Sequence, residues 1–250
     1  MSGLQSARPR LVSVYFGNDP RWEQLAGVLR ATAERHCPGW NVSVERIQPV
    51  VVTGETTHGG IVPNAQKLIA WQQRVNEAPD GAELLLMDAD TFVLGPLDDL
   101  WDEETADLLY TVRAFRWPIN AGVIALRASD RTRAFFGAWR AAQESMLADA
   151  GLHRRWRRKY GGAIGQASFA HALQMSVAAN DCDLHEIPCR IWNCESSQWR
   201  YFGPATRIVH LVRSARHALF DGGPVKSGAG PVLAAWREEA AALSREATPA

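Results

Sequence analysis

Two carboxylates stand two positions apart where a buried strand is expected to end. Leu84 to Met87 is an apolar run, which predicts a strand, and Asp88 and Asp90 come directly after it. Side chains two apart in a strand point to the same side, so both carboxylates can face one point while Ala89 faces the other way. Mn²⁺ and Mg²⁺ take oxygen ligands from carboxylates and from substrate phosphates. The pattern therefore predicts a metal–diphosphate site, with ordinary loop or cap carboxylates as the alternative.

A different chemistry also places an aspartate after a hydrophobic strand. In some phosphatases and phosphotransferases this aspartate is a nucleophile, and the pattern is D-x-D-x-[TV]. The fifth position of that pattern is Phe92 in this chain, and the threonine falls one place early, at Thr91. This mismatch favours the metal–diphosphate interpretation.

The segments around this motif predict an α/β protein. Apolar, β-branched runs indicate strands, and apolar residues at helical spacing indicate helices. The expected strands are 11–16, 41–47, 83–87, 108–112, 121–126, 184–188 and 207–212, and the expected helices are 21–37, 65–77, 131–148, 164–178 and 231–246. Strands that alternate with helices predict a mixed, mostly parallel central sheet flanked by helices. Such sheets bind ligands beyond the carboxyl ends of their strands, where Asp88 and Asp90 would lie.

The length of the chain suits one large domain. We expect this domain to cover residues 11–220, after a flexible N-terminus at 1–10. Residues 221–250 are expected to hold a Gly-rich segment, which could act as a hinge or lid, and a C-terminal helix that packs on the domain or extends it.

Charge and cysteine content narrow the function classes. The 250 residues carry 27 Lys and Arg against 27 Asp and Glu, which argues against a general nucleic-acid binder. No segment approaches the roughly 20 apolar residues of a membrane-spanning helix, and we expect a cytoplasmic protein. The four cysteines form no C-x-x-C pair, so they are expected to be reduced structural thiols, with a metal site as the alternative.

One short segment is strongly basic. The run HRRWRRKYGG at 153–162 predicts a loop, and its cations are Arg154, Arg155, Arg157, Arg158 and Lys159. Such a loop could meet an anionic acceptor, an acidic membrane surface or donor phosphates, and a simple solvated loop is the alternative.

Longer stretches of the chain resemble the glycogenin-like glycosyltransferases, which are retaining nucleotide-sugar transferases with a GT-A fold. Four family patterns occur in this chain: K-L-x-x-W at 67–71, M-D-A-D-T-x-V-L at 87–94, D-D-L-[FW] at 98–101 and N-[SA]-G-V at 120–123. Two further segments are similar to family patterns. EIPCRIWN at 186–193 is similar to L-P-x-x-Y-N, and RIVHLVRSAR at 207–216 is similar to H-x-x-G-x-x-K. Each piece is weak by itself, but their order is specific. The resemblance covers about residues 11–220 and implies a single GT-A domain.

The resemblance also implies a set of site residues around the acidic motif. Asp88, Asp90 and His210 would bind Mn²⁺ or Mg²⁺, although a histidine at the end of an apolar strand is otherwise most often a core residue. Lys67 would reach the donor sugar or its diphosphate, and Asn120 would line the sugar pocket. The alternatives for these last two are a solvated helix face and a turn residue.

The same resemblance places the nucleotide at the first strand. Tyr15, Phe16, Gly17 and Asn18 would hold it, with Tyr15 or Phe16 beside the base and uridine as the usual base of the family. Ala89 of the acidic motif would contribute to the same donor site.

Two segments depart from the family pattern. The family helix that begins D-Q-x-x-[FL] reads Gly165-Gln166 here, so Gln166 is retained while the aspartate that positions the donor sugar is missing. Asp181 could compensate, or the sugar is handled differently, or the enzyme is impaired. In the closing segment Arg213 replaces a glycine and Arg216 replaces the diphosphate-binding lysine, and Arg216 keeps the charge and offers a bidentate fork to phosphate.

Together these expectations describe a metal-dependent hexosyltransferase. It would use a UDP-sugar, with Lys67, Asn120, Gln166 and Arg216 as catalytic residues and Mn²⁺, Lys67 and Arg216 neutralising the departing diphosphate. Retention is expected, with the leaving phosphate taking the proton of an unidentified, possibly anionic acceptor. A non-catalytic sugar-nucleotide binding protein and a nucleotidyltransferase are the alternatives. No nucleic-acid partner is expected, and peripheral membrane contact through 154–159 and a homodimer are both compatible with the sequence.

Overall fold

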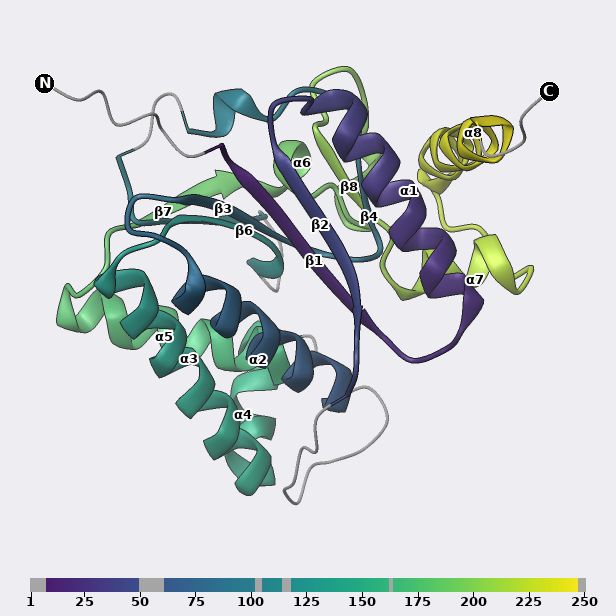
Figure 1. The fold of residues 1–250 in the computed structure, drawn as a ribbon. Coiled ribbons are helices and arrows are strands. Elements are labelled where there is room, and N and C mark those ends of the chain that lie inside the picture. Colours follow the sequence, from purple (N-terminus) through teal and green to yellow (C-terminus); the bar gives the residue numbers. More distant parts are fainter. Residues whose placement is uncertain (1–7, 50–60, 102–104, 114–117, 162–163, 247–250) are drawn as a thin grey trace, which may run out of the picture.

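The computed structural model of this protein describes residues 8–49, 61–101, 105–113, 118–161 and 164–246. A six-stranded sheet with the strand order β2-β1-β3-β6-β5-β7 forms its centre (Figure 1). The strands are β1 (Arg10–Phe16), β2 (Asn41–Ile47), β3 (Glu83–Asp88), β5 (Leu108–Val112), β6 (Ile119–Arg127) and β7 (Leu184–Pro188). Only β6 runs antiparallel to its neighbours in this sheet. The prediction of a mixed, mostly parallel sheet is confirmed.

Alternate residues of β3 enter two different hydrophobic clusters. Leu84 and Leu86 pack in one cluster, and Leu85 and Met87 pack in the other. Because side chains alternate along a strand, this division shows that β3 is buried on both faces. The apolar run that predicted a strand therefore lies in the middle of the core.

Helices cover the two faces of the sheet (Figure 1). The helices α2 (Ile61–Glu77), α3 (Asp130–Ala148), α4 (Ala150–Tyr160) and α5 (Ile164–Ala179) lie together on one side. On the other side α1 (Pro20–His36) packs against α8 (Ala229–Glu246), and the short α7 (Arg213–Phe220) precedes α8. Leu25 and Val28 of α1 share a buried cluster with Val232 and Trp236 of α8. The C-terminal helix is thus packed directly on α1.

Three short elements complete the described part of the chain. They are two 3-10 helices at Asp98–Leu100 and Trp199–Tyr201, and the helix α6 at Cys189–Trp192. All four cysteines are buried and none forms a disulfide. Among the described residues, no helix is both long enough and apolar enough to cross a membrane.

The end of the predicted strand 207–212 differs from the expectation. The strand β8 covers only Ile208–His210, and it pairs with β4 (Thr91–Val93) in a separate two-stranded antiparallel sheet. The amide of Leu211 donates a hydrogen bond to the carbonyl of Asp90 at 2.7 Å, and α7 begins two residues later. The apolar pattern identified the strand but not its short length or its partner.

The predicted basic loop at 153–162 is wrong, because residues 150–160 form α4 and Gly162 lies outside the described residues. Asp149 caps the helix by accepting hydrogen bonds from the amides of Gly151 and Leu152 at 2.7 and 2.9 Å. Gly161, with φ of +66°, ends it. Arginine and lysine favour helices, so their run is compatible with one once the caps are recognised.

Candidate functional site

Asp88, Asp90 and His210 come together at one point of the fold. The Nε2 atom of His210 lies 3.3 Å from Oδ1 of Asp90 and 3.6 Å from Oδ2 of Asp88. One ligand atom from each residue lies within 4.8 Å of the other two. Two carboxylate oxygens and an imidazole nitrogen at this spacing could hold a divalent cation.

The two carboxylates converge by a route that the sequence did not predict. Asp88 is the last residue of β3, but Asp90 lies in a turn with Ala89, so strand alternation does not align them. The turn is held by the hydroxyl of Thr91, which donates to the carbonyl of Asp88 at 2.7 Å. Thr91 then pairs with His210 across β4 and β8, which brings the imidazole beside both carboxylates.

A chain of hydrogen bonds orients the imidazole of His210. The backbone carbonyl of Asn120 can only accept a hydrogen bond, so the hydroxyl of Thr111 donates to it at 2.7 Å. The same hydroxyl accepts a hydrogen bond from Nδ2 of Asn193 at 2.8 Å. This leaves Oδ1 of Asn193 facing Nδ1 of His210 at 3.0 Å. Since Oδ1 is only an acceptor, Nδ1 carries the proton and the Nε2 lone pair faces the carboxylates.

The protonation state of His210 suits a ligand. Burial lowers the pKa of His210 from its ordinary value, and the charge of Asp88 only partly opposes this effect. The imidazole is therefore neutral near pH 7 and keeps its lone pair. A divalent cation that accepts oxygen and nitrogen ligands, such as Mn²⁺, could use that nitrogen together with the carboxylate oxygens.

Gly122 makes room for the imidazole. A Cβ atom at this position would lie 2.7 Å from Nδ1 of His210 and still closer to Cε1, and real Cβ contacts are almost never so short. Replacing Gly122 with alanine should push the ring away, break its bond to Asn193 and weaken Mn²⁺ binding about 10–100-fold. Titration of Mn²⁺ followed by electron paramagnetic resonance measures this. Gly39→Ala is the matched control, because a Cβ at Gly39 has no atom within 4 Å. Unchanged Mn²⁺ affinity in Gly122→Ala would contradict the assignment of His210 as a ligand.

Each carboxylate also has a cationic partner. Nζ of Lys67, on α2, lies 2.5 Å from Oδ1 of Asp88 and 4.4 Å from the centre of the Trp71 ring. Arg216, on α7, forms an ion pair with Asp90, and its guanidinium lies 4.9 Å from the ring centre of Trp22. The two cations thus reach the acidic pair from different helices, and each is positioned by an aromatic ring.

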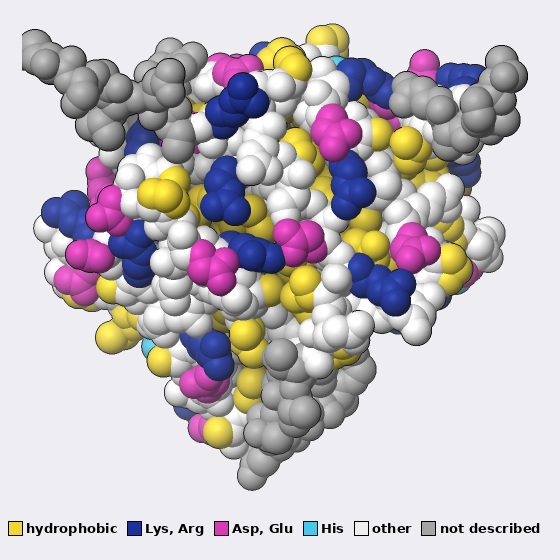
Figure 2. Space-filling view, viewed as in Figure 1, with side chains coloured by type: hydrophobic (Ala, Val, Ile, Leu, Met, Phe, Trp, Pro, Cys, Tyr) yellow, Lys and Arg dark blue, Asp and Glu magenta, His cyan; other side chains and the backbone are white. Residues whose placement is uncertain are grey.

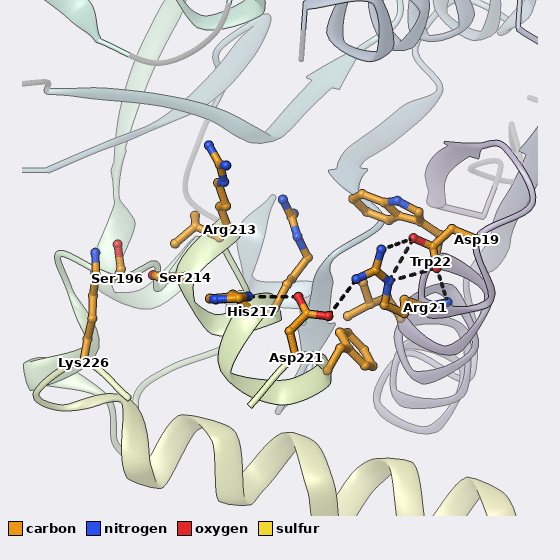
Figure 3. A pocket seen from close by; sticks show the side chains of 13 residues that line it. Asp19, Arg21, Trp22, Ser196, Arg213, Ser214, His217, Asp221 and Lys226 are labelled. Carbon is orange, nitrogen blue, oxygen red and sulfur yellow. Dashed lines mark hydrogen bonds and ion pairs between the residues drawn. The ribbon is translucent and has the colours of Figure 1, made fainter. Parts of the chain in front are cut away.

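A cavity of about 710 Å³ lies between the start of α1 and α7 (Figure 3). Its charged lining residues are Asp19, Arg21, Arg213, Arg216, His217, Asp221 and Lys226. Arg21 bridges Asp19 and Asp221, and Asp221 also contacts His217, whereas Arg213 and Lys226 have no such partner in this view. Because Arg216 both lines the cavity and pairs with Asp90, the cavity adjoins the acidic cluster. Its cations could hold an anionic group beside the cluster.

The residues predicted to hold a nucleotide lie at the same edge of the sheet. Val14 of β1 is in register with Asp88 of β3, so Tyr15 to Asn18 follow at the carboxyl ends of these strands. Tyr15 and Phe16 are half-buried, and Gly17 and Asn18 are exposed. Gly17 has a φ of +82°, a conformation that favours glycine. Their role as nucleotide contacts stays a prediction.

Two other predicted residues are engaged elsewhere. The side-chain amide of Gln166 donates to the carbonyl of Tyr160 at 2.6 Å, at the end of α4. Oδ1 of Asn120 accepts a hydrogen bond from the amide of Gly122 at 2.9 Å, so its side chain folds back on its own strand. Neither residue has a hydrogen bond to the acidic cluster among the described residues.

Asp181 does not compensate for Gly165. Gly165 lies in the first turn of α5, whereas Asp181 follows the end of that helix, about 24 Å away along its axis. The space beside Gly165 belongs to Asn64 of α2, whose Oδ1 would lie 3.2 Å from a Cβ at 165. That suggestion is therefore wrong, because the length of the helix separates the two positions.

The sequence also left a buried ion pair near the cluster unassigned. Nη1 of Arg113 lies 2.7 Å from Oε1 of Glu195, and both side chains are at most 8% exposed. Burial acts to raise the pKa of Glu195, but Arg113 and hydrogen bonds from Ser197 hold it below its ordinary value. The charge of Glu195 also acts to raise the pKa of His210, and the charge of Arg113 acts to lower it. Neither residue belongs to a recognisable motif, and only packing reveals the pair.

Comparison with known proteins supports the fold. No family model matches the chain, and no curated protein matches it.

Similar solved structures include a glycosyltransferase involved in glycosylation of the major capsid of PBCV-1, with 14% identity, a TM-score of 0.57, and coverage of 84% of this chain and 96% of that one. The glycosyltransferase GlyE of Streptococcus pneumoniae TIGR4 gives 12% identity and a TM-score of 0.59, over 96% of this chain and 62% of that one. The galactosyltransferase LgtC in complex with donor and acceptor sugar analogs gives 12% identity and a TM-score of 0.53, over 96% of this chain and 97% of that one. At these identities the likeness shows the fold, so the predicted GT-A fold is confirmed. The bounds of 11–220 stay a prediction, and a specifically glycogenin-like family is not shown.

Proposed function

We propose that this protein is a metal-dependent glycosyltransferase that moves a hexose from a UDP-sugar to an acceptor, with retention at the anomeric carbon. The observation that carries this proposal is the convergence of Asp88 and Asp90 with the distant His210, on a fold shared with glycosyltransferases. The cluster lies at the carboxyl edge of the sheet, where open α/β sheets bind their ligands.

The three candidate ligand atoms fit Mn²⁺. Asp88 and Asp90 offer hard oxygen atoms, and the orientation of His210 presents a neutral nitrogen to the same point. These three residues would hold the cation, which when bound supplies Lewis-acid stabilisation to a diphosphate. Mg²⁺ is the alternative, although an imidazole ligand favours Mn²⁺ over it.

Lys67 and Arg216 supply the remaining positive charge. Departure of the nucleoside diphosphate leaves negative charge on its phosphates, and fixed cations at that point lower the energy of the transition state. Both cations already lie within ion-pair distance of the acidic cluster. With Asp88 and Asp90 engaged in holding the metal, Lys67 and Arg216 would be free to contact the phosphates. Arg213 stands one turn before Arg216 and lines the same cavity.

The sugar and its acceptor are bound by groups that differ from the family pattern. Gly165 carries no carboxylate, so the hydroxyls of the sugar need other partners, and Asn64 fills the space beside it. We assign the proton of the acceptor hydroxyl to the leaving phosphate, because this requires no protein base. The missing carboxylate also favours one second candidate, a protein that binds the sugar nucleotide without turnover.

Calorimetric titration of UDP into the protein, with Mn²⁺ or with chelator, tests the proposal. We expect binding with Mn²⁺ and none with chelator, followed by release of UDP from UDP-glucose or UDP-galactose. Absence of UDP binding in the presence of Mn²⁺ would refute the uridine donor. Tight binding of UDP-sugars without any release of UDP would favour the binding protein, and pyrophosphate released from UTP would favour a nucleotidyltransferase.

A further inference from the structure

The helix α4 presents a wide cationic face to solvent. Arg154, Arg155, Arg157, Arg158 and Lys159 are all exposed. With 3.6 residues per turn they fall within an arc of about 200° around the helix axis. Leu152, Trp156 and Tyr160 are spaced four apart and occupy the remaining arc. The polar and apolar faces of α4 are therefore cleanly separated.

The apolar face of α4 is already used inside the protein. Trp156 stacks on Tyr160, with ring centres 5.4 Å apart, and its edge meets His171 of α5 at 4.7 Å. Tyr160 is buried in the main cluster with Phe169, and its hydroxyl accepts a hydrogen bond from Gln174. These contacts fix the helix on α5, so only its cationic face remains to meet a partner.

Within the described ranges, no acidic side chain pairs with the cations of that face. None of the five forms an ion pair among the described residues, whereas Arg133 contacts both Asp80 and Asp130. Asp149, the N-cap of α4, is an acidic group that their charges reach. The pKa of Asp149 is lowered mainly by hydrogen bonds from the amides of Leu152 and Gly151, and to a smaller extent by the charges of Arg155 and Arg154. The side of the molecule in Figure 2 mixes both signs of charge, as expected for a chain with 27 basic and 27 acidic residues. The charge on α4 is thus a local concentration.

The shape of this surface selects the kind of partner. A helix face is convex, and neither of the two cavities described by their lining residues includes a cation of α4. A small anionic ligand needs a concave site with converging groups. Single-stranded nucleic acid needs exposed aromatic rings for stacking, but Tyr160 is buried and Trp156 is turned inward. Clusters of four to eight basic residues on a helix are typical of contacts with anionic lipid headgroups.

We propose that α4 docks this protein on an anionic membrane surface through electrostatic contact. The contact needs no insertion, because the apolar side of α4 is occupied by α5. It should be reversible and sensitive to salt, since exposed charges are screened within about 10 Å at 0.1 M ionic strength. The docking does not depend on the proposed catalytic function.

The position of α4 gives the docking a consequence for the site. The helix α4 ends at Tyr160 and α5 begins at Ile164, and Gly165 in the first turn of α5 lies beside Asn64 of α2. One turn further along α2, Lys67 contacts Asp88. Figure 1 shows α4 at the same end of the molecule as the start of α2. If the proposed function holds, docking would bring the site near an acceptor at the membrane surface.

Cosedimentation of the full chain with lipid vesicles tests the docking without involving the metal site. The protein is mixed, in chelator and without nucleotide, with vesicles of phosphatidylcholine alone or of phosphatidylcholine with phosphatidylglycerol. We expect binding only to the anionic vesicles, and loss of binding at high salt. The triple variant Arg154→Gln, Arg155→Gln, Arg158→Gln should bind about a hundredfold more weakly, from a factor of about five per basic residue.

The matched control removes three exposed arginines elsewhere. They are Arg190, Arg237 and Arg245, each replaced by glutamine, and none forms an ion pair among the described residues. This control should bind vesicles like the wild type, and thermal melting should show that both triple variants stay folded. Failure of the wild type to bind anionic vesicles, or equal loss in the two triple variants, would overturn the proposal. Tighter binding to a single-stranded oligonucleotide than to vesicles at equal salt would also overturn it.

Discussion

Replacing Asp90 with asparagine should abolish Mn²⁺-dependent binding of nucleotide. Asp90 is 3% exposed, and its carboxylate lies 3.3 Å from Nε2 of His210 and pairs with Arg216. Asparagine keeps the shape of the side chain but removes the charge, which leaves a single anionic ligand and an uncompensated Arg216. Loss of an outer partner of a metal ligand costs about 10–100-fold in metal affinity, so loss of the ligand itself should cost at least about a hundredfold.

Two measurements check this expectation. Electron paramagnetic resonance reports the affinity for Mn²⁺, and calorimetry reports the affinity for UDP with and without the metal. Asp99→Asn is the matched control, because Asp99 is an exposed aspartate whose only ion pair in the described structure is with Arg207 at 3.4 Å. We expect this control to behave like the wild type. Wild-type Mn²⁺ affinity in Asp90→Asn would show that the cluster is not a metal site.

Replacing Arg113 with leucine should destabilise the fold by about 3–5 kcal/mol, the usual cost of removing one partner from a buried ion pair. Glu195 is 3% exposed and would be left as an unpaired charge. For a chain of this length such a loss corresponds to a decrease in melting temperature of about 6–20 °C. The double variant Arg113→Leu, Glu195→Leu should recover much of the stability, because no charge then remains buried.

The stability difference between the wild type and Arg113→Leu should depend on pH. The folded-state pKa of Glu195 lies below its unfolded value, so in the wild type its stabilising contribution is present above the unfolded pKa and is lost as pH falls through the folded pKa. Without Arg113, burial should instead raise the pKa of Glu195. The stability difference between the wild type and Arg113→Leu should therefore narrow on acidification.

Calorimetric melting at several pH values measures these differences. Arg46→Gln is the control, since Arg46 and its partner Glu23 are 40% and 55% exposed and such pairs contribute about 0–1 kcal/mol. A loss of stability in Arg113→Leu no larger than in Arg46→Gln would show that the buried pair carries little energy.

Most of the core elements could be predicted from local patterns. The predicted strands at 108–112 and 184–188 agree with β5 and β7. LLYTV at 108–112 is a short apolar run, which is typical of a buried strand. LHEIP at 184–188 is more polar, and it pairs with β5 at the edge of the sheet. The helix at 150–160 differs from the predicted loop because Asp149 and Gly161 cap it, while a run of charged residues is equally typical of a loop. The strand at 207–212 was overextended because its actual length depends on where β4 ends.

The candidate site was predicted only in its parts. The spacing of Asp88 and Asp90 indicated the ligand chemistry, and a family resemblance added His210, Lys67 and Arg216. The sequence did not reveal that Asn193, through Thr111, orients the imidazole, because these two residues are 82 positions apart. The requirement for Gly122 was equally hidden, since it depends on a ring from another strand.

By itself, the sequence determined the residue types, the alternation of helices and strands, and the hard-ligand chemistry at the end of β3. These follow from interactions between near neighbours, where helical and strand periods are encoded. Only the tertiary structure decided that β8 pairs beside the acidic turn, which tautomer His210 adopts, and that the apolar side of α4 packs on α5. These features depend on contacts between distant segments, and such contacts form only when the whole core packs.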